Sequence, residues 1–219
     1  MVRFPERGRR SFAVLGAMCL LASCGFSMPV STPPAAGPQA ANVGEQLPLR
    51  AGVFYDAAFL ALRRQATVTG GHRAILPVGE TGAAEFQAAC QRRFLSCMRL
   101  ATGTPLPAAD AAALDIVIEP RIEEITIEPP PLIGWAGRWT VTTTWSFDVL
   151  TPSGTRIAED RATARAGTEP AVDLSLSGLE NSSVALGLAS RRVAEEFLRG
   201  MPRLPGMTGR FPSLVGARP

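Results

Sequence analysis

Few residues in this 219-residue chain have the types and spacing that catalysis or metal binding requires. The single histidine, His72, follows the pair Gly70-Gly71, and no cysteine, histidine or carboxylate around it has the spacing of a metal site. The sequence also lacks a phosphate-binding glycine motif, a Gly-x-Ser-x-Gly elbow and a His-Glu-x-x-His zinc motif. We therefore expect His72 to lie on a surface turn, and we expect no metal, no cofactor and no enzymatic activity.

An acidic row is the second place where chemistry could occur. It consists of Glu119, Glu123, Glu124 and Glu128. Paired carboxylates can act as general acid and general base. A row of acids along an amphipathic strand, however, is usually a face exposed to water, and we interpret the row in this way.

Two cysteines, Cys90 and Cys97, could form a disulfide bond, depending on the elements that carry them. On one continuous helix their Cα atoms would lie about 10 Å apart, which is too far for a bridge. If the helix ends near Arg93 and Cys97 lies on the next strand, a bridge becomes feasible. We predict a structural disulfide between these two residues.

An apolar loop over residues 129–137 is the segment that we expect to bind a partner. Three prolines precede Leu132, Ile133 and Trp135, and glycines flank the tryptophan. A stiff proline segment that carries an aromatic tip suits docking into a partner's groove or into a membrane interface. Alternatively, the loop covers the open end of the core and buries Trp135 within its own domain.

The apolar periodicity predicts the elements that must position these residues. Strands are predicted over residues 49–55, 74–78, 95–100, 115–127, 138–150 and 156–166, and helices over 57–64, 81–93 and 181–199. The isoleucines change face around Glu123-Glu124, which predicts a bulge there. This order is typical of an α+β domain over residues 47–199, with an antiparallel sheet that carries helices on one face. Residues 200–219 are rich in proline and glycine, and we expect a flexible tail.

The N-terminus has the three parts of a secretory signal: a basic start, an apolar run over residues 12–21, and small residues before Cys24. Leu21-Ala22-Ser23-Cys24 resembles the lipobox of bacterial lipoproteins. The resemblance implies that residues 1–23 are removed and that Cys24 is lipidated on its thiol, as with palmitate and related acyl chains. The alternative is an ordinary cleaved signal. Arg9-Arg10-Ser11-Phe12 resembles the twin-arginine export motif, although an ordinary basic start explains it equally well.

The charge of the mature chain argues against nucleic acid as a partner. Four of the 22 basic and one of the 19 acidic residues precede Cys24, which leaves 18 of each. Phosphate binding needs a surplus of positive charge, and none remains. Residues 24–46 are rich in Pro, Ala, Gly and Ser, so we expect a flexible tether from the lipid to the domain. Gly25, rather than aspartate, follows Cys24, which favours the outer membrane by analogy with lipoprotein sorting in enteric bacteria.

Three stretches of the domain resemble a family type. They are Leu49-Arg50-Ala51-Gly52-Val53-Phe54-Tyr55, Val78-Gly79-Glu80 before a helix ending in Phe94, and Asp115-Ile116-Val117-Ile118-Glu119-Pro120. They are similar to small envelope lipoproteins, of the ABC-transport auxiliary and lipopolysaccharide-assembly types. The resemblance covers residues 47–199 and implies a compact α+β domain, tethered by lipid, that acts by binding.

From this resemblance we expect a non-enzymatic lipoprotein on the periplasmic face of the outer membrane. It would assist or assemble an envelope transport or secretion complex, so the expected partners are the membrane lipid and an envelope protein complex. The alternative is a module that binds an envelope polymer, either peptidoglycan or lipopolysaccharide. For such a module the acidic row is the one candidate surface in the sequence.

Overall fold

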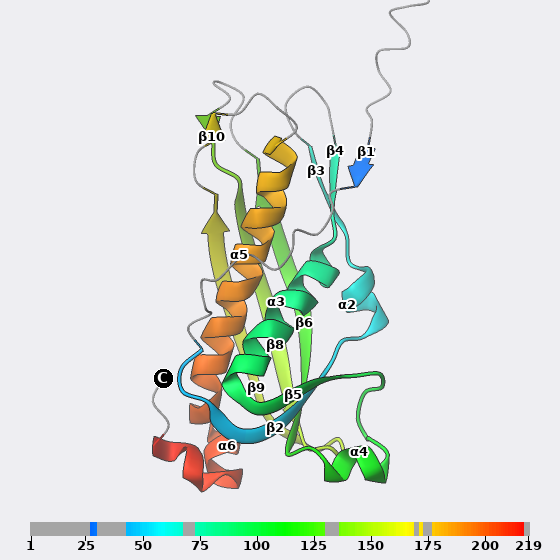
Figure 1. Ribbon diagram of the computed structural model, residues 1–219, viewed down its shortest axis with the longest axis vertical. Helices are drawn as coiled ribbons and strands as arrows, with labels where there is room; N and C mark the ends of the chain where they lie inside the picture. The colour runs from blue at the N-terminus through cyan, green and yellow to red at the C-terminus, as the bar shows by residue number, and fades with distance from the viewer. Residues whose placement is uncertain are drawn as a thin grey trace, which may run out of the picture.

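The computed structural model describes residues 27–29, 43–67, 73–129, 136–168, 171–172 and 177–216. Two long helices, α3 (Val78–Arg93) and α5 (Ser177–Gly200), lie side by side on one face of a five-stranded sheet (Figure 1). The strands, in their order across the sheet, are β5 (Phe94–Leu100), β2 (Leu47–Phe54), β6 (Ile116–Glu128), β8 (Thr140–Leu150) and β9 (Arg156–Gly167). The predicted α+β class, with helices packed on one face, is confirmed.

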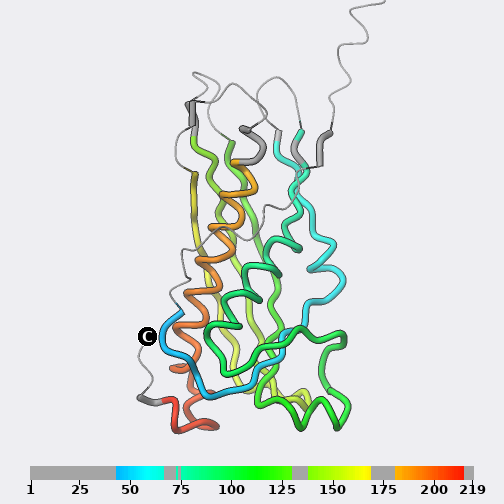
Figure 2. The backbone as a smooth tube through the Cα atoms, in the orientation of Figure 1, coloured from blue at the N-terminus to red at the C-terminus, as the bar shows by residue number. Residues whose placement is uncertain are grey.

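Most of the smaller elements lie at the two ends of this layer (Figure 1 and Figure 2). At one end β1 (Ser27–Pro29), β4 (Arg73–Leu76) and β3 (Arg64–Thr67) form a small sheet, and β10 (Ala171–Val172) pairs with β7 (Ala136–Gly137). The short helices are α2 (Ala57–Ala61), α4 (Ala108–Ala112) and α6 (Pro205–Arg210), with two 3-10 turns, η1 (Met201–Arg203) and η2 (Pro212–Gly216). Helix α6 lies at the end opposite the small sheet.

The large sheet is mixed and not purely antiparallel as predicted. Strand β2 runs parallel to both of its neighbours, β5 and β6, whereas β6, β8 and β9 are antiparallel to one another. The reason lies in the connection from β2 to β5, because α3 carries the chain back along the sheet before β5 begins. Neighbouring parallel strands need a crossover connection of this kind, which a helix usually supplies.

Strand β6 contains the predicted bulge. Its register with β8 shifts between Ile122 and Glu124, which restores a buried face after the change of parity. The pairing of β6 with β2 covers only Ile116 to Ile118. Pro120 therefore lies where β6 has a partner on one side only, and this position tolerates the missing N–H of proline.

Aromatic side chains fill the space between the helices and the sheet. Phe147 of β8 stacks on Phe197 of α5, with ring centroids 3.9 Å apart, and on Phe86 of α3 at 5.4 Å. Gly82 allows α3 to approach the sheet, because a Cβ there would lie 2.8 Å from the Trp145 ring. The position of α3 is thus fixed by tight packing, in which even one added methylene is unfavourable.

The folded unit extends beyond residues 47–199 on both sides. Val43 is buried in the core, and Ser27–Pro29 pair with β4, so parts of the expected tether belong to the fold. The expectation of a flexible tail is wrong for residues 201–216, because Met207 and Leu214 are buried against the sheet and α5. Gly206 makes this contact possible, since a Cβ there would lie 1.7 Å from the Ile157 carbonyl oxygen.

A buried arginine links the start of the domain to the end of α5. The Arg93 guanidinium donates hydrogen bonds to the carbonyl oxygens of Leu198 and Glu45. Burial lowers the pKa of Arg93, and its charge faces the negative end of the α5 dipole. The last turn of α3 is thereby attached to α5 just before β5 begins.

Candidate functional site

Several residues predicted from the sequence lie outside the described residues. They are Cys24, His72, Leu132, Ile133 and Trp135. Lipidation at Cys24 and docking by the apolar loop therefore stay predictions. Among the described residues, no helix is long and apolar enough to cross a membrane, and no group of three or more histidine, cysteine or acidic side chains could hold a metal ion.

The acidic row lies on the face of the sheet opposite the helices, and arginines neutralise much of it. Arg161 of β9 pairs with Glu123 at 2.8 Å, and Arg165 of β9 pairs with Glu128 at 2.8 Å. These arginines point from β9 across the outer surface of β8. The row is thus one side of an ion-pair ladder rather than a free acidic groove.

Three carboxylates meet at one end of this ladder. Glu119, Asp148 and Glu159 lie in register on neighbouring strands, an arrangement that is unfavourable without compensation. Two arginines balance these negative charges, because Arg121 contacts Asp148 at 2.8 Å and Arg156 contacts Asp148 at 3.0 Å. The Asp148 side chain is only 6 % exposed. Its charge is already matched, so this cluster offers no vacant acid to a ligand.

The two cysteines meet the predicted condition for a disulfide, which was that one lies on a helix and the other on the next strand. Helix α3 ends at Arg93, so buried Cys90 lies on the helix and half-buried Cys97 lies on β5. Both are free thiols in the structure. Burial raises the pKa of the Cys90 thiol, and a hydrogen bond to Cys97 adds to this effect. The two sulfurs are therefore neighbours, and a disulfide between them stays a prediction.

A groove of about 510 Å³ runs between the exposed side of α3, helix α2 and strand β5. Its walls include Ala84, Gln87, Ala88 and Gln91 of α3, with Tyr55 and Arg99 facing them. This volume lies in the range of sites that bind small molecules or side chains. The alanines leave the space that longer side chains on α3 would fill.

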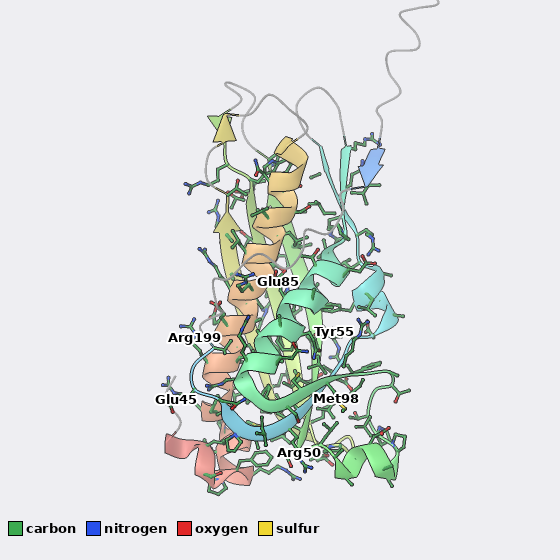
Figure 3. All side chains as sticks on the ribbon, in the orientation of Figure 1. Glu45, Arg50, Tyr55, Glu85, Met98 and Arg199 are labelled. Carbon is green, nitrogen blue, oxygen red and sulfur yellow. The ribbon has the colours of Figure 1, made fainter. Side chains whose placement is uncertain are left out.

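The floor of the groove is rigid and mostly apolar. The Tyr55 hydroxyl donates a hydrogen bond to the Ala83 carbonyl oxygen at 3.2 Å, and burial raises the pKa of Tyr55. The Arg99 guanidinium lies over the Tyr55 ring, 5.4 Å from its centroid. Gln87 attaches β5 to α3, because its Nε2 donates to the Cys97 carbonyl oxygen at 3.3 Å. Figure 3 shows Tyr55 beside α3, with Met98 on the neighbouring strand.

Strand β5, which contributes Arg99 to the groove, also exposes apolar side chains that do not line it. Leu95 is 62 % exposed and Met98 is 49 % exposed, and they are the exposed large hydrophobic residues of the described chain. Both lie on one seven-residue edge strand. On an open sheet edge, such side chains are available for contact with another chain. This surface was not predicted from the sequence, although the segment Phe94–Leu100 carries a single charge, which was a usable signal.

No protein-family model matches this chain, and no curated protein matches it. Solved structures with a similar fold include three bacterial proteins. A Xanthomonas campestris protein described as DUF330 is 11 % identical, with a TM-score of 0.48 over 87 % of this chain and 99 % of the other.

The second is a minor lipoprotein from Acinetobacter baumannii, which is 12 % identical over 73 % of this chain and 96 % of the other, with a TM-score of 0.39. The third is lipoprotein B from Nitrosomonas europaea, which is uncharacterised and 10 % identical over 76 % of this chain and 89 % of the other, with a TM-score of 0.37. Similarities at this level do not identify a function.

Proposed function

We propose that this protein is a lipid-anchored, non-enzymatic accessory or assembly subunit of an envelope transport or secretion complex. Its anchor would be the lipid on Cys24, which would hold the folded domain at the periplasmic face of the outer membrane. The domain would dock onto a protein of the complex through β5 and the adjacent groove. The observation that carries this proposal is the exposure of Leu95 and Met98 on one edge strand.

The energetics of docking support a protein partner. Burying one large aliphatic side chain completely contributes about 1.5–3 kcal/mol, and docking would gain the part of this that corresponds to the exposed 62 % of Leu95 and 49 % of Met98. The groove adds a concave surface with Tyr55 as its floor. Tyrosine and arginine, which line this groove as Tyr55 and Arg99, are among the residue types that dominate binding energy at interfaces.

Binding of an envelope polymer is the weaker alternative. Its candidate surface was the acidic row, and two of those acids, Glu123 and Glu128, already pair with arginines of β9. A polymer that used these carboxylates would have to displace arginines that lie on the same face. We therefore favour the protein partner.

The test is mass spectrometry of proteins that co-purify from crosslinked membranes of the native host. Two variants act as probes: Cys24→Ala removes the lipid, and Leu95→Asp places a charge on β5. Thr163→Asp is the matched control, because Thr163 is exposed on the opposite edge strand, β9. We expect an outer-membrane barrel or transporter subunit with the wild type and with Thr163→Asp, and its loss with the two probe variants.

Two results would contradict the proposal. Recovery of the same partner with Leu95→Asp would show that β5 is not the docking surface. Recovery of polymer fragments alone, with no specific protein, would reject the accessory role and favour the polymer-binding alternative.

A further inference from the structure

Strand β5 is an open edge of the large sheet. All of its pairing is with β2, so its other side has no neighbouring strand among the described residues. Along such an edge the outward N–H and C=O groups can pair with another chain. On β5, side-chain amides already donate to two carbonyl oxygens: Gln46 to that of Phe94 and Gln87 to that of Cys97. Over seven residues this edge is long enough to pair with an added strand.

The other free edges of the sheet carry the protection that β5 lacks. Strand β9 alternates charged residues, including Arg161 and Arg165, and Gly206 of α6 packs directly on its backbone at Ile157. Beyond Ile118, β6 carries Pro120 and four glutamates. Charges, proline and covering elements prevent edge-to-edge pairing. Strand β5 has one charged residue and no proline, with exposed Leu95 and Met98.

The side chains of β5 indicate which side chains of an added strand would be recognised. Arg99 pairs in register with Val53 and lies on the helix side, over Tyr55, whereas Met98 pairs with Gly52 and lies on the opposite face. Successive side chains of an added strand would alternate in the same way. One set would meet Arg99 and the groove, and the other set would meet Met98.

The charge at this edge favours an acidic occupant. Arg99 is exposed, and within the described part of the chain it makes a cation–π contact but no ion pair. Arg92, at the end of α3, is also exposed. The nearest acid of the groove, Glu80, is already paired with Arg63 at 2.7 Å. A partner segment that carries carboxylates would supply the missing charge.

We propose that β5 accepts an extended, acidic segment of a partner protein as an additional strand of the sheet. Backbone hydrogen bonds to β5 give the affinity, and Arg99 with the groove over Tyr55 selects the side chains on one face. This inference rests on the proposed docking at β5. A second copy of the chain fits less well, because its own β5 is basic at the same position and its β9 edge is charged and partly covered.

The test uses the full-length lipidated protein, purified in detergent, and three synthetic heptapeptides. The first alternates valine with glutamate, the second alternates valine with lysine, and the third is the first with two valines replaced by proline. Binding is followed by fluorescence anisotropy, and backbone hydrogen exchange locates the bound segment. The protein variant is Arg99→Glu, at an exposed position where substitution leaves the core intact.

We expect the valine–glutamate peptide to slow exchange across Phe94–Leu100 and to leave Arg156–Gly167 unchanged. The proline peptide should not bind, because it lacks N–H donors at two positions. Arg99→Glu should weaken binding of the glutamate peptide about two- to fivefold, the value of an exposed ion pair. The same variant should bind the lysine peptide more tightly than the wild type does.

Three results would overturn the inference: binding of the proline peptide with equal affinity, no protection of Phe94–Leu100, or protection of this strand that grows with protein concentration alone. The last result would identify a second copy as the occupant. If the peptide does not bind but Leu95→Asp still loses its partner in membranes, docking at β5 is supported and strand addition is wrong. If the peptide binds but Leu95→Asp keeps its partner, strand addition at β5 is supported and the proposed function is wrong.

Discussion

The ion pair between Glu85 and Arg191 offers a quantitative test of how the helical layer is held together. Arg191 Nε of α5 lies 3.0 Å from Glu85 Oε2 of α3, and the two side chains are 9 % and 5 % exposed. Figure 3 shows Glu85 on the side of α3 that faces α5. Because α3 also forms one wall of the groove, this contact helps to fix the candidate docking surface.

The substitution Glu85→Gln keeps the shape of the side chain and removes its charge. Arg191 is then a buried cation that has lost the carboxylate of Glu85, and removing one member of a buried pair costs about 3–5 kcal/mol. For a domain of this size we expect the midpoint of thermal unfolding to fall by roughly 6–15 °C. Glu80→Gln is the matched control, because Glu80 lies on the same helix and its pair with Arg63 is exposed. It should cost less than about 1 kcal/mol.

The assays are thermal unfolding, for the midpoints, and urea unfolding, for the free energies, of the two single variants and of the double variant Glu85→Leu/Arg191→Leu. Replacing both partners by apolar side chains removes both charges of this pair, so the double variant should be more stable than Glu85→Gln. The reasoning is refuted if Glu85→Gln and Glu80→Gln cost the same. It is also refuted if the double variant is less stable than Glu85→Gln.

Three further predictions concern other parts of the chain. The side-chain hydrogen bond from Arg50 holds the pKa of Asp115 below its ordinary value. The ionised carboxylate therefore stabilises the folded state fully at neutral pH, and this stabilisation is lost as the pH falls through the lowered pKa. Asp115→Asn should therefore lower the urea midpoint at neutral pH and have little effect at about pH 2; an equal effect at both pH values would contradict this. Alkylation under denaturing conditions without reductant, followed by intact mass, should leave Cys90 and Cys97 unmodified, whereas two modified thiols would exclude the disulfide. Trp135→Ala separates the two interpretations of the apolar loop, because a docking tip predicts an unchanged thermal midpoint and a tryptophan buried in its own domain predicts a marked decrease.

Patterns within single elements were enough to predict much of the fold. The alternation over residues 138–150 identified β8 because both of its faces have a consistent character, apolar beneath the helices and polar on the other side. The change of parity around Glu123-Glu124 located the bulge in β6 for the same reason. These features depend on local periodicity, which the sequence records directly.

Features that depend on the choice of partner were not predictable in this way. The parallel pairing of β2 follows from the path of the connecting helix α3, which periodicity does not encode. The packing of residues 201–216 depends on isolated contacts, such as Met207 and Gly206, in a segment whose prolines and glycines suggested flexibility.

The candidate site illustrates the same limit. Residues 95–100 were predicted to be extended, but only the strand order shows that β5 is an edge. The acidic row was identified as an exposed face, while its arginine partners come from β9, more than thirty residues away for the pair of Glu128 with Arg165. Charges that meet across strands cannot be matched before the register is known.

The most direct test of docking at β5 is photo-crosslinking in intact membranes of the native host. A benzoylphenylalanine at Met98 reports on the docking strand, and the same group at Thr163 on β9 is the control, since both positions are exposed. We predict that Met98 captures one protein, that the crosslinked peptides map to a single acidic segment of it, and that Thr163 does not capture this protein. Equal capture at both positions, or capture at Thr163 alone, would contradict docking through β5.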